Sequence, residues 1–419
     1  MKIVFLAFGT RGDVQPLLAL GKGLVGAGFD VRIVASADFQ DFVEGAGLPY
    51  MGFRTNMQEM MNTDAGKEWT NNSSDNPLNE AKNMRRMLEF ADEEIHDDLL
   101  RVAEDADVIV SGLPMFMSAQ SLAEKFNIRH ITIQFVPFNP TKEGRATIQP
   151  TFPTRQAWIN RLSGYIGQGF TYWIFKDVTN KFRVQMGLDP LSYSQYVRLY
   201  NREIPVIYGL SKHVITEPQD WRDNTHITGY WFYDAPSDWQ PSQELCEFLN
   251  AGEKPVYIGF GSMSNKDPEA TTKIMVDALQ QAGKRGIIHS GWAGLNADTL
   301  PDDIFMLDFA PHDWLFPRMA AVIHHGGAGT TAAGIRAGVP ATVVSHMADQ
   351  PYWGRRVHEM GIGSGLIRRH ELTTERLAQA IREMTDNPQI AENARILGEK
   401  VRQEDGVAEA VKVFQKLLR

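Results

Sequence analysis

The chain contains 419 residues, of which 42 are Lys or Arg and 51 are Asp or Glu, so its formal net charge is −9. This length is sufficient for two domains with separate cores, and a composition of 43% hydrophobic and 22% charged residues excludes a disordered or fibrous protein. The acidic balance also excludes a protein that binds nucleic acid by neutralising its phosphates with surplus cations.

Short apolar runs alternate with helical patterns along the whole chain. Within a run, polar and apolar residues do not alternate, which is typical of parallel strands that are buried on both faces. The predicted strands are Lys2–Ala7, Val31–Ala35, Val108–Ser111, His130–Gln134, Val256–Phe260, Ile287–His289, Phe305–Leu307, Ala321–His324 and Ala341–Ser345. This order predicts an α/β protein with two doubly wound, Rossmann-like parallel-sheet domains.

A stretch rich in Pro, Asp, Trp and Ser separates the two series of strands. We therefore predict an N-terminal domain over residues 1–234, an interdomain linker over residues 235–254 and a C-terminal domain over residues 255–419. Two such domains are expected to face a central cleft, with ligands beyond the carboxyl ends of the strands. Residues that directly follow a strand are thus the candidates for ligand binding and catalysis.

The first such turn, Gly9–Pro16 (GTRGDVQP), follows the first strand and opens a helix. It lacks the third glycine of a dinucleotide-binding fingerprint, and the second strand ends on Ala35–Ala37 rather than on an acidic residue. We therefore expect neither a nicotinamide nor a flavin cofactor. Asp13 places a carboxylate at this edge of the sheet, where it serves either as a helix cap or as a functional group.

A second turn, His324–Thr331 (HHGGAGTT), also joins a predicted strand to a helix. Gly326 and Gly327 let the backbone approach a ligand, and the first N–H groups of a helix carry partial positive charge, so the turn predicts an anion site. No Lys precedes Thr330, so the turn is not a Walker loop. Ser262, after the first strand of the same domain, is placed to reach the same anion. The alternative is a tight turn with a buried histidine.

A metal site is the competing interpretation of this half of the chain. The side chains of a suitable type are His312, Asp313, His324, His325, His346 and Asp349. Their spacing matches no familiar metal motif, and the adjacent His324 and His325 point to opposite faces of a strand. We therefore expect no metal ion.

The segment Phe152–Phe175 is unusually aromatic and has helical character. It is either a core helix, the wall of an apolar pocket or a weak contact with a membrane surface. The candidate residues for binding an apolar molecule are Phe8, Trp158, Phe170 and Trp173. No window offers about 18 uninterrupted apolar residues, so we expect no transmembrane segment and a cytoplasmic protein.

Three motifs in the second half resemble one family. His324–Thr331, Arg336–Pro340 (RAGVP) and Asp349–Gly354 (DQPYWG) together resemble the donor-binding signature of family 1 glycosyltransferases of the GT-B fold. The resemblance covers essentially the whole chain and implies that the C-terminal half binds a nucleotide sugar and the N-terminal half the acceptor.

The first turn is typical of one branch of this family. Gly9–Pro16, Ser290–Trp292 (SGW) and Pro311–Phe316 (PHDWLF) look most like the sterol 3-β-glucosyltransferases and their bacterial relatives, which include antibiotic glycosyltransferases. The resemblance implies an inverting, metal-independent enzyme that moves glucose from UDP-glucose to a hydroxyl of a hydrophobic acceptor, such as a sterol, a flavonoid or another natural product. The implied partners are the UDP-sugar and this acceptor, without nucleic acid and without a cofactor.

The resemblance also implies roles for individual residues. Asp13 matches the general base, where many relatives carry histidine, and Val110–Gly112 offers no carboxylate for an Asp–His pair. The implied donor contacts are Ser262, His324, Gly326, Gly327, Gly329 and Thr330 at the diphosphate, Trp292, Pro311 and His312 near the base, and Asp349 and Gln350 at the sugar. Two segments depart from the pattern: Ala332–Ala333, where plant members carry Glu, and Ser345–Met347, which replaces a Pro-aromatic run.

Two other functions stay open. One is a dTDP-sugar-dependent glycosyltransferase that acts on a macrolide or peptide antibiotic. The other is a non-catalytic protein that binds nucleotide sugars.

Overall fold

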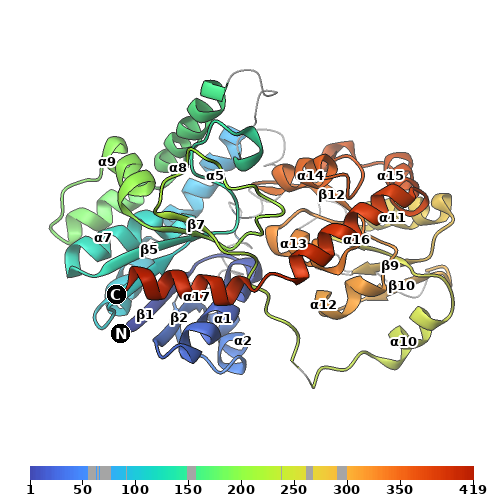
Figure 1. Cartoon of the computed structure of the whole chain (residues 1–419), viewed down its shortest axis with the longest axis horizontal. Coiled ribbons are helices and arrows are strands. Elements are labelled where there is room, and N and C mark those ends of the chain that lie inside the picture. Colours follow the sequence, from blue (N-terminus) through green and yellow to red (C-terminus); the bar gives the residue numbers. More distant parts are fainter. Residues whose placement is uncertain are drawn as a thin grey trace. The chain divides into compact units, whose positions relative to one another are not determined.

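The computed structural model describes residues 1–54, 63, 66, 77–90, 92–148, 157–236, 238–260, 268–289 and 300–419. The chain divides into two compact units, each with its own parallel sheet (Figure 1). The first unit holds the described residues 1–54, 63, 66, 78–233 and 404–419, and the second holds residue 77 and those from 234 to 403.

The sheet of the first unit has seven strands in the order β3-β2-β1-β4-β5-β6-β7, and every neighbouring pair is parallel. The strands are β1 (Lys2–Ala7), β2 (Asp30–Ser36), β3 (Tyr50–Phe53), β4 (Val108–Ser111), β5 (Arg129–Gln134), β6 (Val206–Tyr208) and β7 (Thr225–Ile227). Ile3 of β1 pairs with Val31 on one side and Val108 on the other, and all three side chains are buried. The four strands predicted for this half are confirmed.

Helices connect these strands. They are α1 (Arg11–Gly26), α2 (Gln40–Gly45), α5 (Pro77–Phe90), α6 (Asp92–Ala103), α7 (Phe116–Phe126), α8 (Ala157–Gln185) and α9 (Tyr193–Arg198). The helical character predicted for the aromatic segment is confirmed from Ala157 onward, and the residues before it lie outside the described part of the chain. None of the described helices is both long and apolar enough to cross a membrane.

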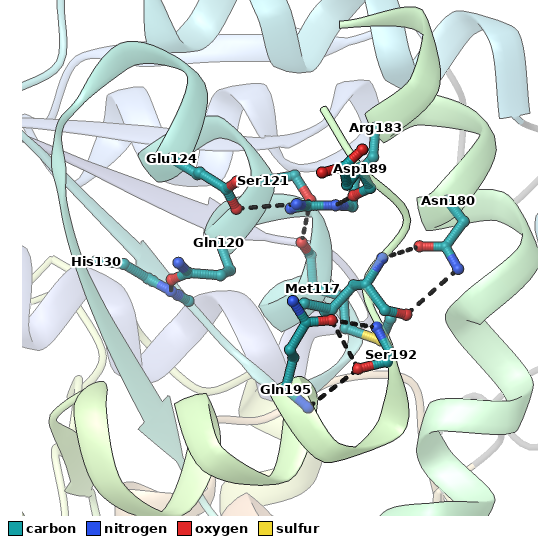
Figure 2. A network of polar contacts seen from close by, with 11 residues as sticks. Met117, Gln120, Ser121, Glu124, His130, Asn180, Arg183, Asp189, Ser192 and Gln195 are labelled. Atoms are coloured by element: carbon teal, nitrogen blue, oxygen red, sulfur yellow. Dashed lines mark hydrogen bonds and ion pairs between the residues drawn. The ribbon is translucent and has the colours of Figure 1, made fainter. Parts of the chain in front are cut away.

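The C-terminal end of α8 is fixed to α7 by one buried cation (Figure 2). The Arg183 guanidinium is 3% exposed, and it donates to the Glu124 carboxylate at 2.9 Å and to the Ser121 hydroxyl at 3.3 Å. Its Nε donates to the carbonyl of Asp189 at 2.7 Å, which also ties down the segment after the helix. A buried guanidinium requires such partners because an unpaired charge would be strongly destabilising.

The sheet of the second unit has six parallel strands in the order β10-β9-β8-β11-β12-β13. The strands are β8 (Val256–Gly259), β9 (Gly286–His289), β10 (Ile304–Leu307), β11 (Ala321–His324), β12 (Ala341–Ser345) and β13 (Ile367–Arg368). The helices are α10 (Gln243–Asn250), α11 (Pro268–Ala282), α12 (His312–Leu315), α13 (Ala328–Ala337), α14 (Gln350–Glu359), α15 (Thr374–Asp386) and α16 (Pro388–Arg402). The five strands predicted here are confirmed.

The predicted linker does not stand apart from the second unit. Leu245 of α10 is 2% exposed and belongs to the same buried cluster as Tyr257 of β8. The Trp239 ring contacts Trp314, with centroids 5.2 Å apart. The described residues between 235 and 254 therefore belong to the second unit, because apolar side chains such as Trp239 and Leu245 pack into it.

The last helix, α17 (Gly406–Leu417), belongs to the first unit, whereas we expected residues 255–419 to form one domain. Phe414 is fully buried, and its ring lies 6.3 Å from that of Phe5 in β1. Gly23 of α1 permits close packing, since a Cβ there would lie 2.5 Å from Val407. The sequence shows that α17 has an apolar face but does not show which sheet this face covers.

We expect Phe414→Ala to lower the free energy of unfolding of the first unit by about 3–5 kcal/mol, because it leaves a large cavity against β1. Lys416→Ala, on the exposed face of the same helix, is the matched control and should change it by less than about 0.5 kcal/mol. Urea unfolding gives the magnitude, and amide hydrogen exchange in α1 gives the location. Faster exchange in α16 with α1 unchanged would contradict the assignment of α17.

Candidate active site

The turn between β1 and α1 holds Asp13 in a fixed position. Thr10 precedes the helix, and its backbone N–H donates to Asp13 Oδ2 at 2.7 Å, while its hydroxyl lies 3.3 Å from the same oxygen. Gly9 has φ = +148°, and a Cβ there would lie 2.2 Å from Asp13 Oδ2. The turn therefore requires glycine, since any side chain would push the carboxylate away.

Asp13 caps α1 with one oxygen only. Within the described part of the chain, its Oδ1 accepts no hydrogen bond. Burial raises the pKa of this carboxyl group, and the hydrogen bonds from Thr10 act in the opposite direction. Asp13 is thus able to cap the helix and to accept a proton or a hydrogen bond from a ligand, because Oδ2 binds the turn and Oδ1 keeps its acceptor capacity.

An apolar cluster lies next to this turn in the first unit. Phe8, which directly follows β1, packs against a buried cluster that includes Ile174, as Phe170 and Trp173 do. The rings of Phe170 and Trp173 stack with centroids 6.1 Å apart. Three of the four predicted acceptor residues are therefore brought together. Trp158 is not in the cluster and is 63% exposed.

Sequence reasoning missed a buried polar group at the end of β4. The Ser111 hydroxyl lies 2.9 Å from His130 Nε2. On the other side of the ring, His130 Nδ1 lies 3.0 Å from Gln120 Oε1 (Figure 2). Burial lowers the pKa of His130 to about 3, so the ring is neutral. Ser111 is fully buried, which restricts this group to a structural role.

In the second unit, the turn between β11 and α13 is built around His324. The ring is fully buried, and its Nδ1 accepts the backbone N–H of Gly326 at 3.0 Å. Gly326 has φ = +95°, and a Cβ there would lie 2.5 Å from Val343. The left-handed backbone and the close approach both require glycine, so this residue sets the path of the turn.

The hydrogen bond to Nδ1 determines the state of the His324 ring. Burial lowers the pKa of His324 well below its usual value, so the ring is neutral and its proton is on Nε2. Among the described residues, no group accepts this proton, although Nε2 is buried. In this environment His324 is able to donate a hydrogen bond to an anion, but it does not supply a positive charge.

The N-terminus of α13 lies directly after this ring. Gly327 is the N-cap, and the first backbone bond of the helix runs from the Thr331 N–H to the Gly327 carbonyl at 2.9 Å. The preceding N–H groups, including those of Gly329 and Thr330, have no intrahelical acceptor. They carry the positive end of the helix dipole, which is suited to an anion.

The turn after β12 places two further predicted residues. Asp349 Oδ2 accepts the indole N–H of Trp353 at 2.8 Å. Gln350 is buried, and its Oε1 accepts the backbone N–H groups of His346 at 2.7 Å and Met347 at 3.0 Å. Both side chains therefore hold the turn in shape, a role that the sequence did not reveal.

The remaining predicted donor residues follow other strands. Pro311 is the N-cap of α12 and comes shortly after β10. The neighbouring His312 ring stacks on Phe316 with centroids 4.3 Å apart. Ser262 and Trp292 lie outside the described residues. Within the ranges that the structure describes, no three metal-ligating side chains come together.

Two domain families match this chain. Residues 3–145 match the glycosyltransferase family 28 N-terminal domain. Residues 275–417 match the C-terminal domain of proteins like erythromycin biosynthesis protein CIII.

Two similar proteins of Arabidopsis thaliana are both sterol 3-beta-glucosyltransferases. UGT80A2 is 38% identical over 100% of this chain and 66% of its own length, and UGT80B1 is 33% identical over 100% of this chain and 68% of its own length. This chain thus spans about two thirds of these relatives. The crystal structure of the glycosyltransferase VinC in complex with DTDP has the same fold, with a TM-score of 0.69 at 18% identity over 99% of each chain. The chain therefore belongs to the glycosyltransferases of the GT-B fold, in the family that contains the sterol 3-beta-glucosyltransferases.

Proposed function

We propose that this chain transfers glucose from UDP-glucose to the hydroxyl of a sterol-like acceptor, with inversion and without a metal ion. The observation that carries the proposal is the similarity to sterol 3-beta-glucosyltransferases, which extends over both halves of the chain. An apolar acceptor is further supported by the cluster around Phe8, which is the neighbour of the turn that holds Asp13.

In this proposal the diphosphate of the donor lies at the N-terminus of α13. His324 Nε2 is a buried donor without an acceptor among the described residues, and such a group is costly to bury unless a ligand completes its hydrogen bond. The free N–H groups of Gly329 and Thr330 supply further donors at the same place. Preorganised donors of this kind stabilise the charge that develops on a leaving diphosphate.

In the proposed reaction the acceptor oxygen attacks the anomeric carbon as Asp13 takes its proton. The bond from this carbon to the diphosphate oxygen breaks, and its electron pair leaves with UDP. A carboxylate with a raised pKa is a stronger base than an exposed one, provided that it stays ionised at the working pH. Asp13 Oδ1 is the acceptor for the proton, since Oδ2 already binds Thr10.

Asp13→Asn should lower kcat by about 10²–10⁴ and leave UDP affinity nearly unchanged. The amide oxygen of asparagine still accepts the Thr10 N–H, so the cap of α1 remains and the loss reports on the missing base. Steady-state kinetics with UDP-glucose and a sterol, together with calorimetric titration of UDP, measure the two effects. Turnover within threefold of the wild type would refute Asp13 as the base.

His324→Ala should weaken UDP binding and lower kcat, since one hydrogen bond to the diphosphate is lost at about 1.5–3 kcal/mol, or roughly tenfold to a hundredfold in Kd. His130→Ala is the matched control, because it removes a buried, neutral imidazole of the first unit that has a structural role and lies outside the proposed donor site. Calorimetric titration of UDP into both variants tests the difference. Equal losses in the two variants would reduce the role of His324 to packing.

A dTDP-sugar donor is the second candidate, supported by the structure of VinC with DTDP. Thermal unfolding with each nucleotide separates the two donors. We expect UDP to raise Tm and dTDP at the same concentration to raise it less. A larger increase in Tm with dTDP would make a dTDP-sugar, instead of UDP-glucose, the proposed donor.

A further inference from the structure

The first half of α8 exposes large apolar side chains to solvent on one face. Trp158, Leu162 and Ile166 recur every four residues and are 63%, 48% and 65% exposed. We call these three side chains the α8 stripe. Large apolar side chains at this spacing normally face a core, so their exposure on one helix face requires another explanation.

The opposite face of the same helical turns is packed too closely for the helix to rotate and bury the α8 stripe. Gly164 is buried, and a Cβ there would lie 2.7 Å from Pro140. Asn160 is also buried and donates to the carbonyl of Lys142 at 3.2 Å. Because this face is small and polar and fits closely, the helix is unable to rotate and bury its large side chains.

The charge around the α8 stripe fits a lipid surface. From Ala157 to Phe175 the helix has one charged residue, Arg161, and no acidic one, in a chain whose net charge is −9. Tyr193 is 38% exposed and donates its hydroxyl to the carbonyl of Tyr165 on the same helix. Aliphatic side chains with Trp, Tyr and Arg at the edges are typical of segments that lie in a membrane interface.

A second copy of the chain is a poorer occupant. A stable protein interface needs about 800 Å² from each partner. Three partly exposed side chains offer much less than this, but they are sufficient for a weak and reversible contact with lipid.

We propose that the α8 stripe docks the protein on a lipid surface, from which the acceptor enters the first unit. The same helix continues into the apolar cluster through Phe170 and Trp173, next to Phe8. Its far end is held by Arg183, so the first turns are presented on a fixed support (Figures 1 and 2). The docking stands on the exposed stripe alone, whereas the entry of an acceptor rests on the proposed function.

The test is sedimentation with phosphatidylcholine vesicles. The wild type should bind, and Leu162→Ser combined with Ile166→Ser should weaken binding at least about tenfold, because two apolar side chains are lost from the interface. Val184→Ser is the matched control, since Val184 is 59% exposed at the other end of α8. It should bind as the wild type does. Circular dichroism checks that the double variant is folded.

Three results would overturn the docking. These are no binding by the wild type, equal binding by the double variant, or a wild-type dimer in sedimentation velocity that the double variant converts to a monomer. The last result would assign the α8 stripe to self-association.

A kinetic comparison tests the entry of the acceptor. The double variant should lose about tenfold in turnover of a sterol embedded in vesicles and keep its turnover of the same sterol dispersed in cyclodextrin. Equal losses in both formats would refute entry from the membrane. If the wild type transfers glucose in neither format, the proposed function fails, and the vesicle sedimentation still decides the docking.

Discussion

Parallel pairing is the constraint on which the candidate residues of each unit depend. In a parallel sheet the carboxyl ends of all strands lie at one edge, and every turn into a helix brings unpaired backbone N–H groups there. Asp13 follows β1, His324 ends β11 and Asp349 follows β12, and each of these strands lies between two others in its sheet. The candidate residues therefore lie in short turns, and the pairing of the neighbouring strands determines the positions of those turns.

The same arrangement explains how an acidic chain is suited to an anionic donor. Salt screens the repulsion between the net charge of −9 and an anion beyond about 10 Å. The N–H groups at the start of α13 attract an anion by direct contact, which salt screens much less. In the proposed donor site, His324 offers a neutral ring, because burial lowers its pKa. A neutral donor avoids the cost of burying a cation, and Gly326 fixes which ring nitrogen carries the proton.

Continuous apolar runs were sufficient to predict nine strands, because burial on both faces leaves a clear pattern in the sequence. The strands that the pattern missed are short or interrupted, such as β3 with its Gly52 and the two-residue β13. The place of α17 was also missed, since an apolar helix face does not specify its sheet. Turn motifs identified Asp13 and His324 as candidate site residues. The hydrogen bonds that Gln350 accepts from its own turn were not predictable, because they depend on the exact course of the backbone there.

The candidate residues of the two units differ in how the sequence encodes them. The proposed donor site of the second unit is local, because a strand, a glycine turn and a helix start supply His324 and its neighbours within a dozen residues. The apolar cluster of the first unit is distributed, since Phe8, Leu88 and Ile174 come from three distant segments. A local motif keeps its geometry while the rest of the chain changes, whereas a distributed surface changes with any of its helices. Under the proposed function, acceptor preference is therefore the property that this fold is free to vary, and α8 contributes most of the cluster's side chains.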